Sequence, residues 1–401
     1  MTHDPRIHLA VALEGAGWHP AAWREPSSRP HELFTAAYWT DLVREAERGL
    51  LDLVTLEDSL TVQSADPFAP DARTDEVRGR LDALLIASRV SPVTSRIGLV
   101  PTVTVTHTEP FHVSKGVATL DHTSLGRAGW QVKISGREDE ARQVGRRRVG
   151  LSVSALHDEA SRQQIVDLFD EATDAVEVSR RLWDSWEDDA EIRDVATDRF
   201  LDADLVHRID FEGRWFSVRG PAIVPRPPQG QPVVVALAHS EIPYRFAARS
   251  ADVVFVTPLD QADADRILLE LRRAVDAEDR RLERLRVFAD LVVLLDGPGE
   301  SAVDRLRRLD ALGRPLTSDT AVVAGSATDL ADRVAALRLA GYDGVRLRPA
   351  VLTDDLPRIV DDLVPELQRR GLFRAEYEAA TLRGTLGLEE HPADRYTEEL
   401  A

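Results

Sequence analysis

The chain of 401 residues is long enough to bury a large core, and 43% of its residues are hydrophobic. Its formal net charge of −19 argues against nucleic acid or an anionic membrane surface as a general partner. Because the sequence has no cysteine, disulfides, thiolate metal sites, iron–sulfur clusters and a cysteine nucleophile are excluded.

The N-terminal residues and the hydropathy of the chain bear on its location. Residues 1–13 contain no basic segment followed by an apolar stretch, which a secretory signal peptide requires. No uninterrupted apolar run approaches the roughly 20 residues of a membrane-spanning helix. We therefore expect a soluble protein of the cytoplasm.

Short apolar runs alternate with longer amphipathic segments in the first half of the chain. The runs predict strands, and apolar positions that recur every three or four residues predict helices. The predicted strands are residues 7–13, 51–56, 96–105 and 128–134. The predicted helices are residues 34–46, with Gly49 at the end, 81–90, 111–120 and about 158–186. Before the long helix, residues 136–148 form a polar stretch rich in arginine.

A polar, turn-rich segment interrupts the alternation at about residues 188–231. It ends in Gly220-Pro221 and the proline-rich residues 225–231, which favour neither regular helix nor central strand. We expect an insertion with little regular structure and a short hairpin around residues 211–218.

The alternation resumes in the second half and completes the predicted fold. The strands are residues 232–237, 252–256, 286–295 and 344–348. The helices are residues 244–249, 262–284, a segment from Ser326 or Thr328 to Gly341, and a helical tail at about 354–401. Eight strands, each followed by helix, favour an α/β fold that forms a single (β/α)8 TIM barrel over residues 1–401. No GxGxxG follows the first strand and no P-loop occurs, which weakens an open nucleotide-binding sheet.

Catalysis in such a barrel takes place at the carboxyl ends of the strands, which selects a short set of polar residues. These candidates are Glu57, Asp58, Ser59, Thr104, Thr106, His107, Glu109, Lys133, Ser135, Arg137, His239, Ser240, Glu241 and Arg348. Glu57 and Asp58 are adjacent on an extended chain and point in opposite directions, so they do not form a catalytic pair.

Two other kinds of site were weighed against plain structural roles. His107 with Glu109, and Asp121 with His122, have spacings that occur in metal sites. Asp121 and His122 fall at the end of a helix on the opposite face of the barrel, where they hold the next turn, so we expect no metal. Ser240 lacks the G-x-S-x-G context of a serine nucleophile.

A basic cluster lies in this acidic sequence at Arg142, Arg146, Arg147 and Arg148. Such a cluster attracts a phosphate or a carboxylate substrate, or else it is a solvated loop offset by nearby acidic residues. The sequence leaves both readings open.

Several segments resemble one family of enzymes. The longest are residues 102–112 (TVTVTHTEPFH) and 118–130 (ATLDHTSLGRAGW). Shorter ones are residues 182–186, 230–235, 246–249, 251–255, 381–383 and 386–388. Together they span nearly the whole chain, and they resemble the bacterial-luciferase-like flavin-dependent monooxygenases. The branch is the one that includes nitrilotriacetate and dibenzothiophene-sulfone monooxygenases.

The resemblance implies a two-component oxidoreductase. Reduced FMN is supplied by a separate NAD(P)H-dependent flavin reductase, oxygen adds to the flavin to give a hydroperoxide, and a small organic substrate is oxygenated. The protein then supplies position and a water-poor cavity. The family also implies a homodimer. Two alternatives remain: a flavin-free or altered-site barrel that acts as a binding or subunit protein, and an F420-dependent oxidoreductase.

The resemblance assigns flavin-binding roles to several positions. The carboxylate after the second strand falls on Asp58, and the phosphate-contacting serine after the fifth falls on Ser240. The hydroxyl position after the third strand falls on Thr104 or its neighbour Val105, of which Thr104 is preferred. The family's asparagine in the fourth strand is Gln131 here. No residue of this chain is assigned a catalytic role.

Other positions depart from the family pattern. Residues 130–135 read WQVKIS instead of WNVVTS, which places Lys133 where the family has a small residue. The phosphate loop G-x-S-x-x-G-R reads AHSEIPY at residues 238–244, where Pro243 removes an amide donor and Glu241 adds repulsion. The family's His-x-x-x-Tyr pair falls on Ile165 and Phe169, or in an alternative alignment on His157 and Ser161, which makes His157 a further candidate flavin ligand.

Overall fold

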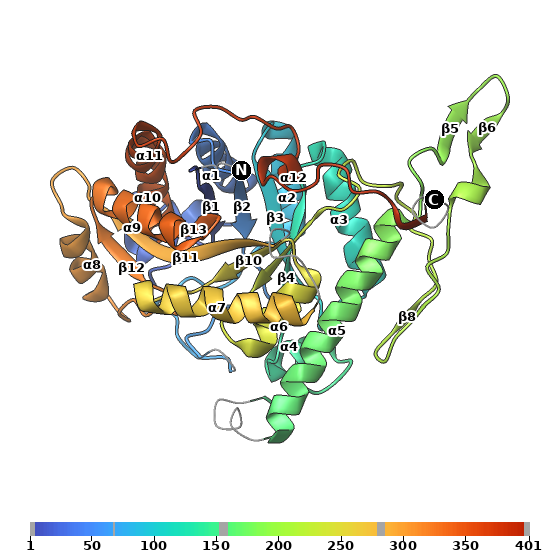
Figure 1. The fold of residues 1–401 in the computed structure, drawn as a ribbon. Coiled ribbons are helices and arrows are strands. Elements are labelled where there is room, and N and C mark those ends of the chain that lie inside the picture. Colours follow the sequence, from blue (N-terminus) through green and yellow to red (C-terminus); the bar gives the residue numbers. More distant parts are fainter. Residues whose placement is uncertain (1–4, 67–68, 152–158, 279–284, 397–401) are drawn as a thin grey trace.

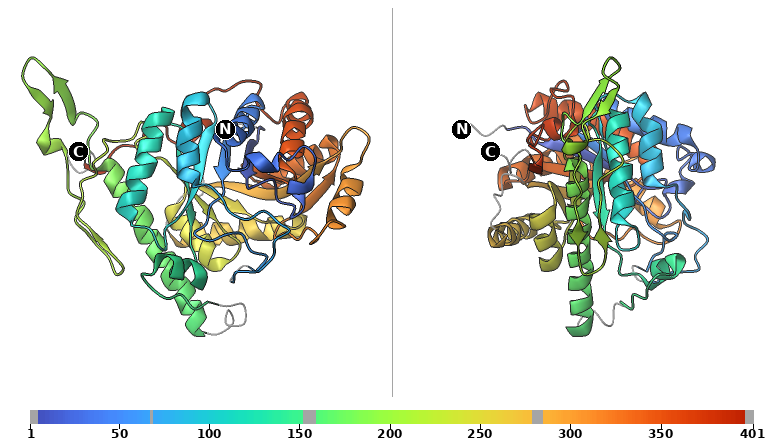
Figure 2. Two further views of the ribbon diagram at one scale, coloured as in Figure 1. Left: turned by 180° about the vertical axis from the view of Figure 1, so that it is seen from behind. Right: turned by 90° about the vertical axis from the view of Figure 1, so that its right-hand side faces the viewer.

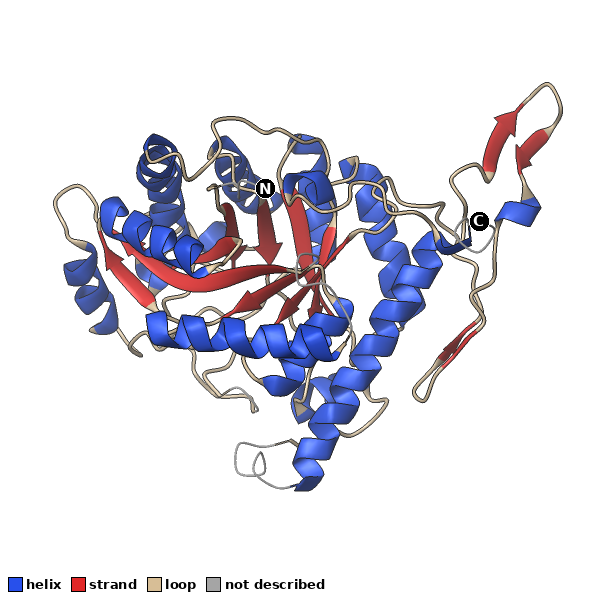
Figure 3. Cartoon of the chain, in the orientation of Figure 1, coloured by secondary structure: helices blue, strands red, loops and turns tan. Residues whose placement is uncertain are grey.

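The computed structural model describes residues 5–66, 69–151, 159–278 and 285–396. Within these ranges, eight parallel strands close a barrel, in which β13 returns to β1 and β10 joins β11 (Figure 1, Figure 3). They are β1 (His8–Leu13), β2 (Leu53–Leu56), β3 (Gly98–Thr104), β4 (Gly129–Lys133), β9 (Val233–Leu237), β10 (Val253–Val256), β11 (Arg286–Leu295) and β13 (Gly344–Pro349). The predicted barrel and its eight strands are thereby confirmed.

Helices pack around the outside of the barrel (Figure 1). The longer ones are α1 (Ala36–Arg48), α2 (Ala83–Val90), α3 (Pro110–Ser124), α5 (Glu159–Asp184), α6 (Glu241–Ser250), α7 (Gln261–Ala277), α8 (Ala302–Asp310) and α9 (Ala327–Ala340). The chain then forms α10 (Leu352–Arg358), the π-helix η7 (Ile359–Leu363), α11 (Val364–Arg369) and α12 (Leu382–Thr385). Short 3-10 turns are η1 (Ala22–Arg24), η2 (Pro30–Glu32), η3 (Ser91–Val93) and η5 (Ala203–Leu205). No helix in the described ranges is long and apolar enough to cross a membrane.

Helix α9 shows how local sequence sets an element boundary. The Ser326 hydroxyl accepts a hydrogen bond from the Asp329 amide, and the Asp329 carboxylate accepts one from the Ser326 amide. This capping box satisfies two backbone donors at the start of the helix. Gly341 ends the helix in the left-handed region at φ 110°, which a side chain rarely tolerates. Both predicted limits are therefore confirmed.

The lower half of the barrel interior is apolar. Leu53, Val100, Val235, Phe255 and Phe288 belong to one buried cluster that also contains the two leucines of the C-terminal segment, Leu382 and Leu386. The α12 segment thus plugs the amino-terminal opening of the barrel. Because strand side chains alternate, the residues between these positions face the surrounding helices.

Several elements differ from the sequence-based expectation. Helix α8 was not predicted, and the helical tail expected over about 354–401 is interrupted, because residues 370–381 between α11 and α12 form turns and irregular chain. A ninth strand, β12 (Val322–Gly325), pairs with the last residues of β11, which extends past its neighbours. It was not predicted, although residues 321–324 (AVVA) form a short apolar run; the β12 side chains are exposed or half-buried. The stretch expected to be merely polar contains α4 (Glu138–Val144), which has three acidic residues in its first turn and ends at Gly145 with φ 74°. Acidic side chains favour the first turn of a helix.

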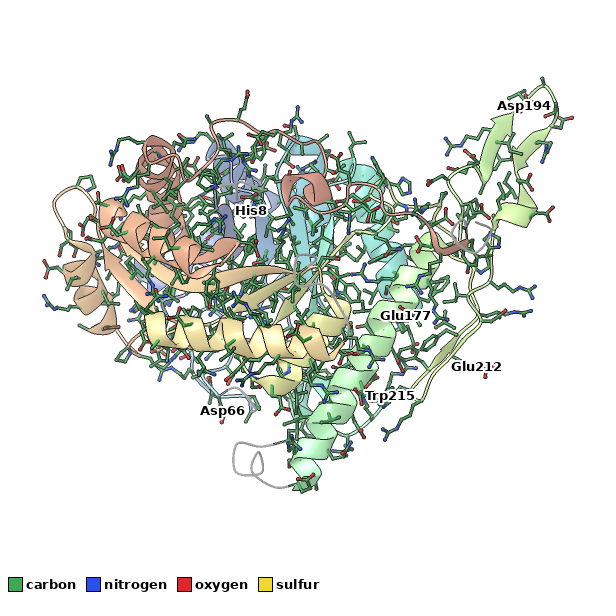
Figure 4. All side chains as sticks on the ribbon, viewed as in Figure 1. His8, Asp66, Glu177, Asp194, Glu212 and Trp215 are labelled. Atoms are coloured by element: carbon green, nitrogen blue, oxygen red, sulfur yellow. The ribbon has the colours of Figure 1, made fainter. Side chains whose placement is uncertain are left out.

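The insertion projects from the barrel beyond the long helix α5 (Figure 2). It carries two hairpins, β5 (Glu191–Asp194) with β6 (Arg199–Leu201) and β7 (Phe211–Glu212) with β8 (Ser217–Val218). The hairpin predicted around residues 211–218 is confirmed, whereas the β5–β6 hairpin was missed. Asp194 at the first hairpin lies far from the barrel (Figure 4). The second hairpin lies along α5, where Arg214 pairs with Asp167 at 2.9 Å.

Candidate active site

The carboxyl ends of the strands lie at one end of the barrel, opposite the plug. Figure 4 marks the two ends, with His8 at the start of β1 and Asp66 in the loop that follows β2. Above the apolar floor, the barrel interior becomes polar. This polar layer contains Thr55, Glu57, Thr102, Gln131, Asp290 and Arg346, which hydrogen bonds join into one network.

An arginine–aspartate pair forms the centre of the polar layer. The Arg346 guanidinium donates from Nε and Nη2 to the two carboxylate oxygens of Asp290, at 2.8 and 2.6 Å. The Asp290 side chain is 0% exposed. Burial alone raises the pKa of Asp290, but the charges of Arg346 and Arg348 outweigh it and hold that pKa below its ordinary value. The two arginine charges therefore favour the ionised form of Asp290 in the barrel interior.

The third guanidinium nitrogen of Arg346 reaches the β2 and β4 side of the layer. Nη1 donates to Glu57 Oε1 at 3.1 Å and to Gln131 Oε1 at 2.9 Å. Gln131 in turn donates to Glu57 Oε2 at 3.1 Å and to the Thr102 hydroxyl at 2.7 Å. The amide of Gln131 is thus fully engaged by protein, with its oxygen and nitrogen turned toward the layer.

Arg348 extends the network toward the loop that precedes β12. It donates to Asp290 and, at 2.7 Å, to Asp319 Oδ1. Its guanidinium also lies 4.7 Å from the centre of the Trp18 ring, in a cation–π contact. Arg348 was a sequence candidate, and the structure places it in the layer.

Asp58 points away from Glu57, as predicted for neighbours on an extended chain. Its Oδ1 accepts from the Ser59 amide at 2.7 Å, and its Oδ2 accepts from the amide of Ala83, the first residue of α2, at 2.9 Å. Burial raises the pKa of Asp58. Both carboxylate oxygens therefore anchor backbone, and the start of α2 rests on this side chain.

Lys133 and Thr104 lie directly above the polar layer. They are register partners on β4 and β3, two residues beyond Gln131 and Thr102, so all four side chains face the interior. Lys133 Nζ donates to the main-chain oxygen of Asp58 at 2.8 Å. Its side chain is 29% exposed, and burial lowers its pKa. The barrel mouth thus carries a cation where the family has a small residue.

Sequence reasoning missed a buried carboxylate, Glu140 of α4. Its Oε1 accepts from the Ser59 hydroxyl and lies 3.9 Å from Lys133 Nζ, whereas its Oε2 is buried without a partner among the described residues. Glu140 is 0% exposed, because α4 folds over the ends of β2 and β4. The acidic run at the start of α4 was the available signal, but the stretch of residues 136–148 was described only as polar and rich in arginine.

Neither His107 nor the basic cluster forms the sites first considered. His107 is buried, and burial followed by the charge of Arg147 lowers its pKa. Among the described residues, no three potential metal ligands come together. The cluster is offset by acidic neighbours: Arg142 and Arg148 pair with Glu138, Arg146 with Glu109, and Arg147 with Glu171.

Ser240 lies at the barrel mouth next to the end of β4, where the neighbouring strand β9 leads into α6. It is exposed, and its hydroxyl forms no capping hydrogen bond. Pro243 falls in the first turn of α6, where a backbone amide has no partner within the helix in any case. The side chain of Glu241 is 77% exposed and lies 4.0 Å from Arg162 of α5.

Several other positions singled out in the sequence hold a turn or pack against apolar neighbours. Asp121 accepts from the amide and side chain of Gln229 and from the Ala128 amide, which confirms that it holds the turn after α3. Phe169 packs edge-on against Phe246, with ring centres 5.7 Å apart. Ile165 packs beside a small apolar cluster under α4. His157 lies outside the described residues.

The model of the luciferase-like monooxygenases matches residues 16–319 of the chain. The chain belongs to the luciferase-like monooxygenase family. It is 30% identical to N-acetyl-S-(2-succino)cysteine monooxygenase of Bacillus subtilis, over 98% of both chains. It is also 30% identical to nitrilotriacetate monooxygenase component A of Aminobacter aminovorans, over 97% of this chain and 98% of that protein. This luciferase-like monooxygenase is therefore an oxidoreductase, and the predicted branch is confirmed.

The fold comparison agrees with the sequence comparison. The crystal structure of a long-chain alkane monooxygenase matches all of this luciferase-like monooxygenase, with a TM-score of 0.85 and 24% identity. At that identity the likeness shows the shared barrel. In such a barrel the carboxyl ends of the strands, where the polar layer, Lys133 and Ser240 lie in this structure, are the usual location of the active site.

Proposed function

We propose that this enzyme is the oxygenating component of a two-component system that uses reduced FMN and oxygen to oxygenate a small organic substrate. A separate NAD(P)H-dependent flavin reductase supplies the reduced FMN. The word "component" in the name of the nitrilotriacetate relative, and the two pristinamycin IIA synthase subunits among the relatives, support a divided system. We further propose a homodimer in the cytoplasm and one barrel domain over residues 1–401.

The main support for this proposal is that hydrogen-bond donors and acceptors gather at the carboxyl end of a luciferase-like barrel. They lie above the polar layer, in which the charges of the arginines and carboxylates already offset one another. At the phosphate end, the free hydroxyl of Ser240 and the start of α6 fit an anion. At the ring end, Thr104 and Lys133 face the mouth. The residues present therefore fit FMN, and its bound reduced ring supplies the activation of oxygen.

The other assigned residues act through their neighbours. Asp58 holds Lys133 with its main-chain oxygen and orients α2 with its carboxylate. Gln131 is fixed by Arg346 and Thr102, so it presents a rigid surface below the ring. A rigid and enclosed site limits water near the reacting atoms. A contact between His157 and the flavin remains part of the proposal.

Titration of the purified protein with oxidised and then with reduced FMN tests this function, with flavin fluorescence and absorbance as readouts. We expect saturable binding of reduced FMN and oxygen consumption when a flavin reductase and NAD(P)H are added. Absence of saturable binding in both redox states would favour the flavin-free alternative. Binding of F420 in preference to FMN would favour the deazaflavin alternative.

A further inference from the structure

A groove of about 690 Å³ lies between α6 and α7, beside Ser240. The two helices pack against each other on the outside of β9 and β10 (Figure 1). Ser240, Tyr244 and Arg245 line the groove from the start of α6, and Arg266, Glu270 and Arg273 line it from α7. Ala274 and Ala277 keep the α7 side open because their side chains are small.

The buried hydroxyl of Tyr244 is the first sign of a ligand. Tyr244 is 1% exposed and lines the groove, yet no described residue accepts or donates a hydrogen bond at its hydroxyl. A buried polar group without a partner costs about 1–3 kcal/mol, so such groups are rare and call for a reason. Burial raises the pKa of Tyr244 to about 12, which keeps the hydroxyl protonated and able to donate.

Three arginines (Arg245, Arg266 and Arg273) and two carboxylates (Glu241 and Glu270) line the groove, so its charged side chains leave a net positive charge. The Glu241 carboxylate is 77% exposed and lies 4.0 Å from Arg162. Arg266 is neutralised by Asp263 and by Glu270 at 2.8 Å. In contrast, no hydrogen bond or ion pair joins Arg245 or Arg273 to another residue of the described ranges. Two guanidinium groups therefore remain available on opposite walls of the groove, and arginine binds phosphate through paired hydrogen bonds.

The start of α6 adds backbone donors to the same place. This helix has ten residues, and the hydroxyl of its N-cap residue, Ser240, makes no capping bond. The first turn of a helix presents unpaired amides and a partial positive charge to an anion. In α6 these amides belong to Glu241 and Ile242, because Pro243 has none. The family pattern has Gly-Arg where this chain has Pro243-Tyr244, so the donors lost from the loop are replaced by groups that face the groove.

We propose that the α6–α7 groove binds the phosphate of a phosphate monoester, through Tyr244, Arg273, Arg245 and Ser240. When that monoester is FMN, the inference rests on the proposed function and moves the phosphate from the loop after β9 toward α7. Another phosphate monoester binds by the same chemistry, and the experiment separates the two sources.

The test compares FMN, riboflavin and inorganic phosphate on the full chain by calorimetry and flavin fluorescence. Riboflavin has the same ring but no phosphate. We expect Arg273→Gln to weaken binding of FMN and of phosphate at least about tenfold, the usual scale for one lost charge-assisted contact, and to leave riboflavin unchanged. Arg272→Gln, on the neighbouring residue outside the groove, is the matched control and should change none of the three affinities.

A second variant separates a ligand contact from a packing role. Tyr244→Phe removes only the hydroxyl, so we expect the ligand-free Tm to stay the same or rise while FMN or phosphate binds more weakly. A lower Tm with unchanged affinity overturns the inference.

The outcomes also distinguish the inference from the proposed function. If FMN and riboflavin bind equally and Arg273→Gln has no effect, the groove is not a phosphate site. That result leaves the proposed flavin-dependent function unaffected. Phosphate binding that depends on Arg273, without binding of either flavin, supports the groove as a site for another phosphate monoester. The same result would contradict the proposed flavin-dependent function.

Discussion

At the scale of single residues, the Asp290–Arg346 ion pair holds together the polar layer of the barrel interior. Asp290→Asn leaves Arg346 and Arg348 buried with one carboxylate fewer, so we expect a loss of about 3–5 kcal/mol in the free energy of unfolding. Urea denaturation measures it. Asp361→Asn is the control, because Asp361 pairs with Arg48 at the surface and is 56% exposed. That change should stay within about 1 kcal/mol. Equal losses in the two variants would contradict the assignment.

Lys133 gives the second prediction at this scale. Reduced FMN carries a negative charge on its ring that oxidised FMN lacks, and the Lys133 ammonium faces the barrel mouth. We therefore expect Lys133→Met to weaken binding of reduced FMN about tenfold and that of oxidised FMN much less. Fluorescence titration in both redox states, with Lys115→Met on α3 as the control, measures the difference. An equal loss of affinity for reduced and for oxidised FMN would contradict this role of Lys133.

At the scale of elements, α2 depends on a side chain outside it. Asp58 accepts from the amides of Ser59 and Ala83, so Asp58→Ala leaves two backbone donors without their acceptor. We expect the free energy of unfolding to fall by about 1–2 kcal/mol. Asp41→Ala, an exposed position on α1, controls for a general effect of losing a surface carboxylate. Unchanged stability in Asp58→Ala would mean that this anchor contributes nothing.

The elements also show where sequence-based prediction succeeded and failed. Strands buried on both faces are largely apolar, so all eight barrel strands were predicted from runs such as residues 233–237. The β5–β6 hairpin gave no signal because its exposed strands lack that pattern. β12 has the short apolar run AVVA at residues 321–324, and that run was passed over. In the site, residues at strand ends were identifiable by position, including Lys133 and Arg348. Asp290 lies in the middle of β11, so its position along the strand did not single it out. Its ion-pair partners depend on which side chains face the barrel interior, and that follows from the strand register, which the sequence alone does not give.

At the scale of the whole molecule, Asp121 ties α3 and the start of β4 to the end of the insertion. Burial raises its pKa to about 6. Because the folded pKa lies above the ordinary value, the folded state binds a proton more tightly, and the contribution of this group to stability grows as pH falls through about 6. Relative to Asp121→Asn, the native protein should gain at most about 1.4 kcal/mol per pH unit between about pH 6 and 4. Urea denaturation across that range measures it, and a gain toward higher pH would contradict it.

The projecting insertion has a consequence for protease digestion. Arg193 and Arg199 lie exposed on the β5–β6 hairpin, away from the barrel core (Figure 2). Exposed hairpin tips are the preferred places for proteolytic nicking. Trypsin should therefore cut there first, and the two fragments should remain together under native conditions, because the barrel strands on either side of the cut pair with one another. The nicked protein would migrate as one species in gel filtration and as two bands after denaturation. The role of the insertion can then be tested separately from that of the barrel.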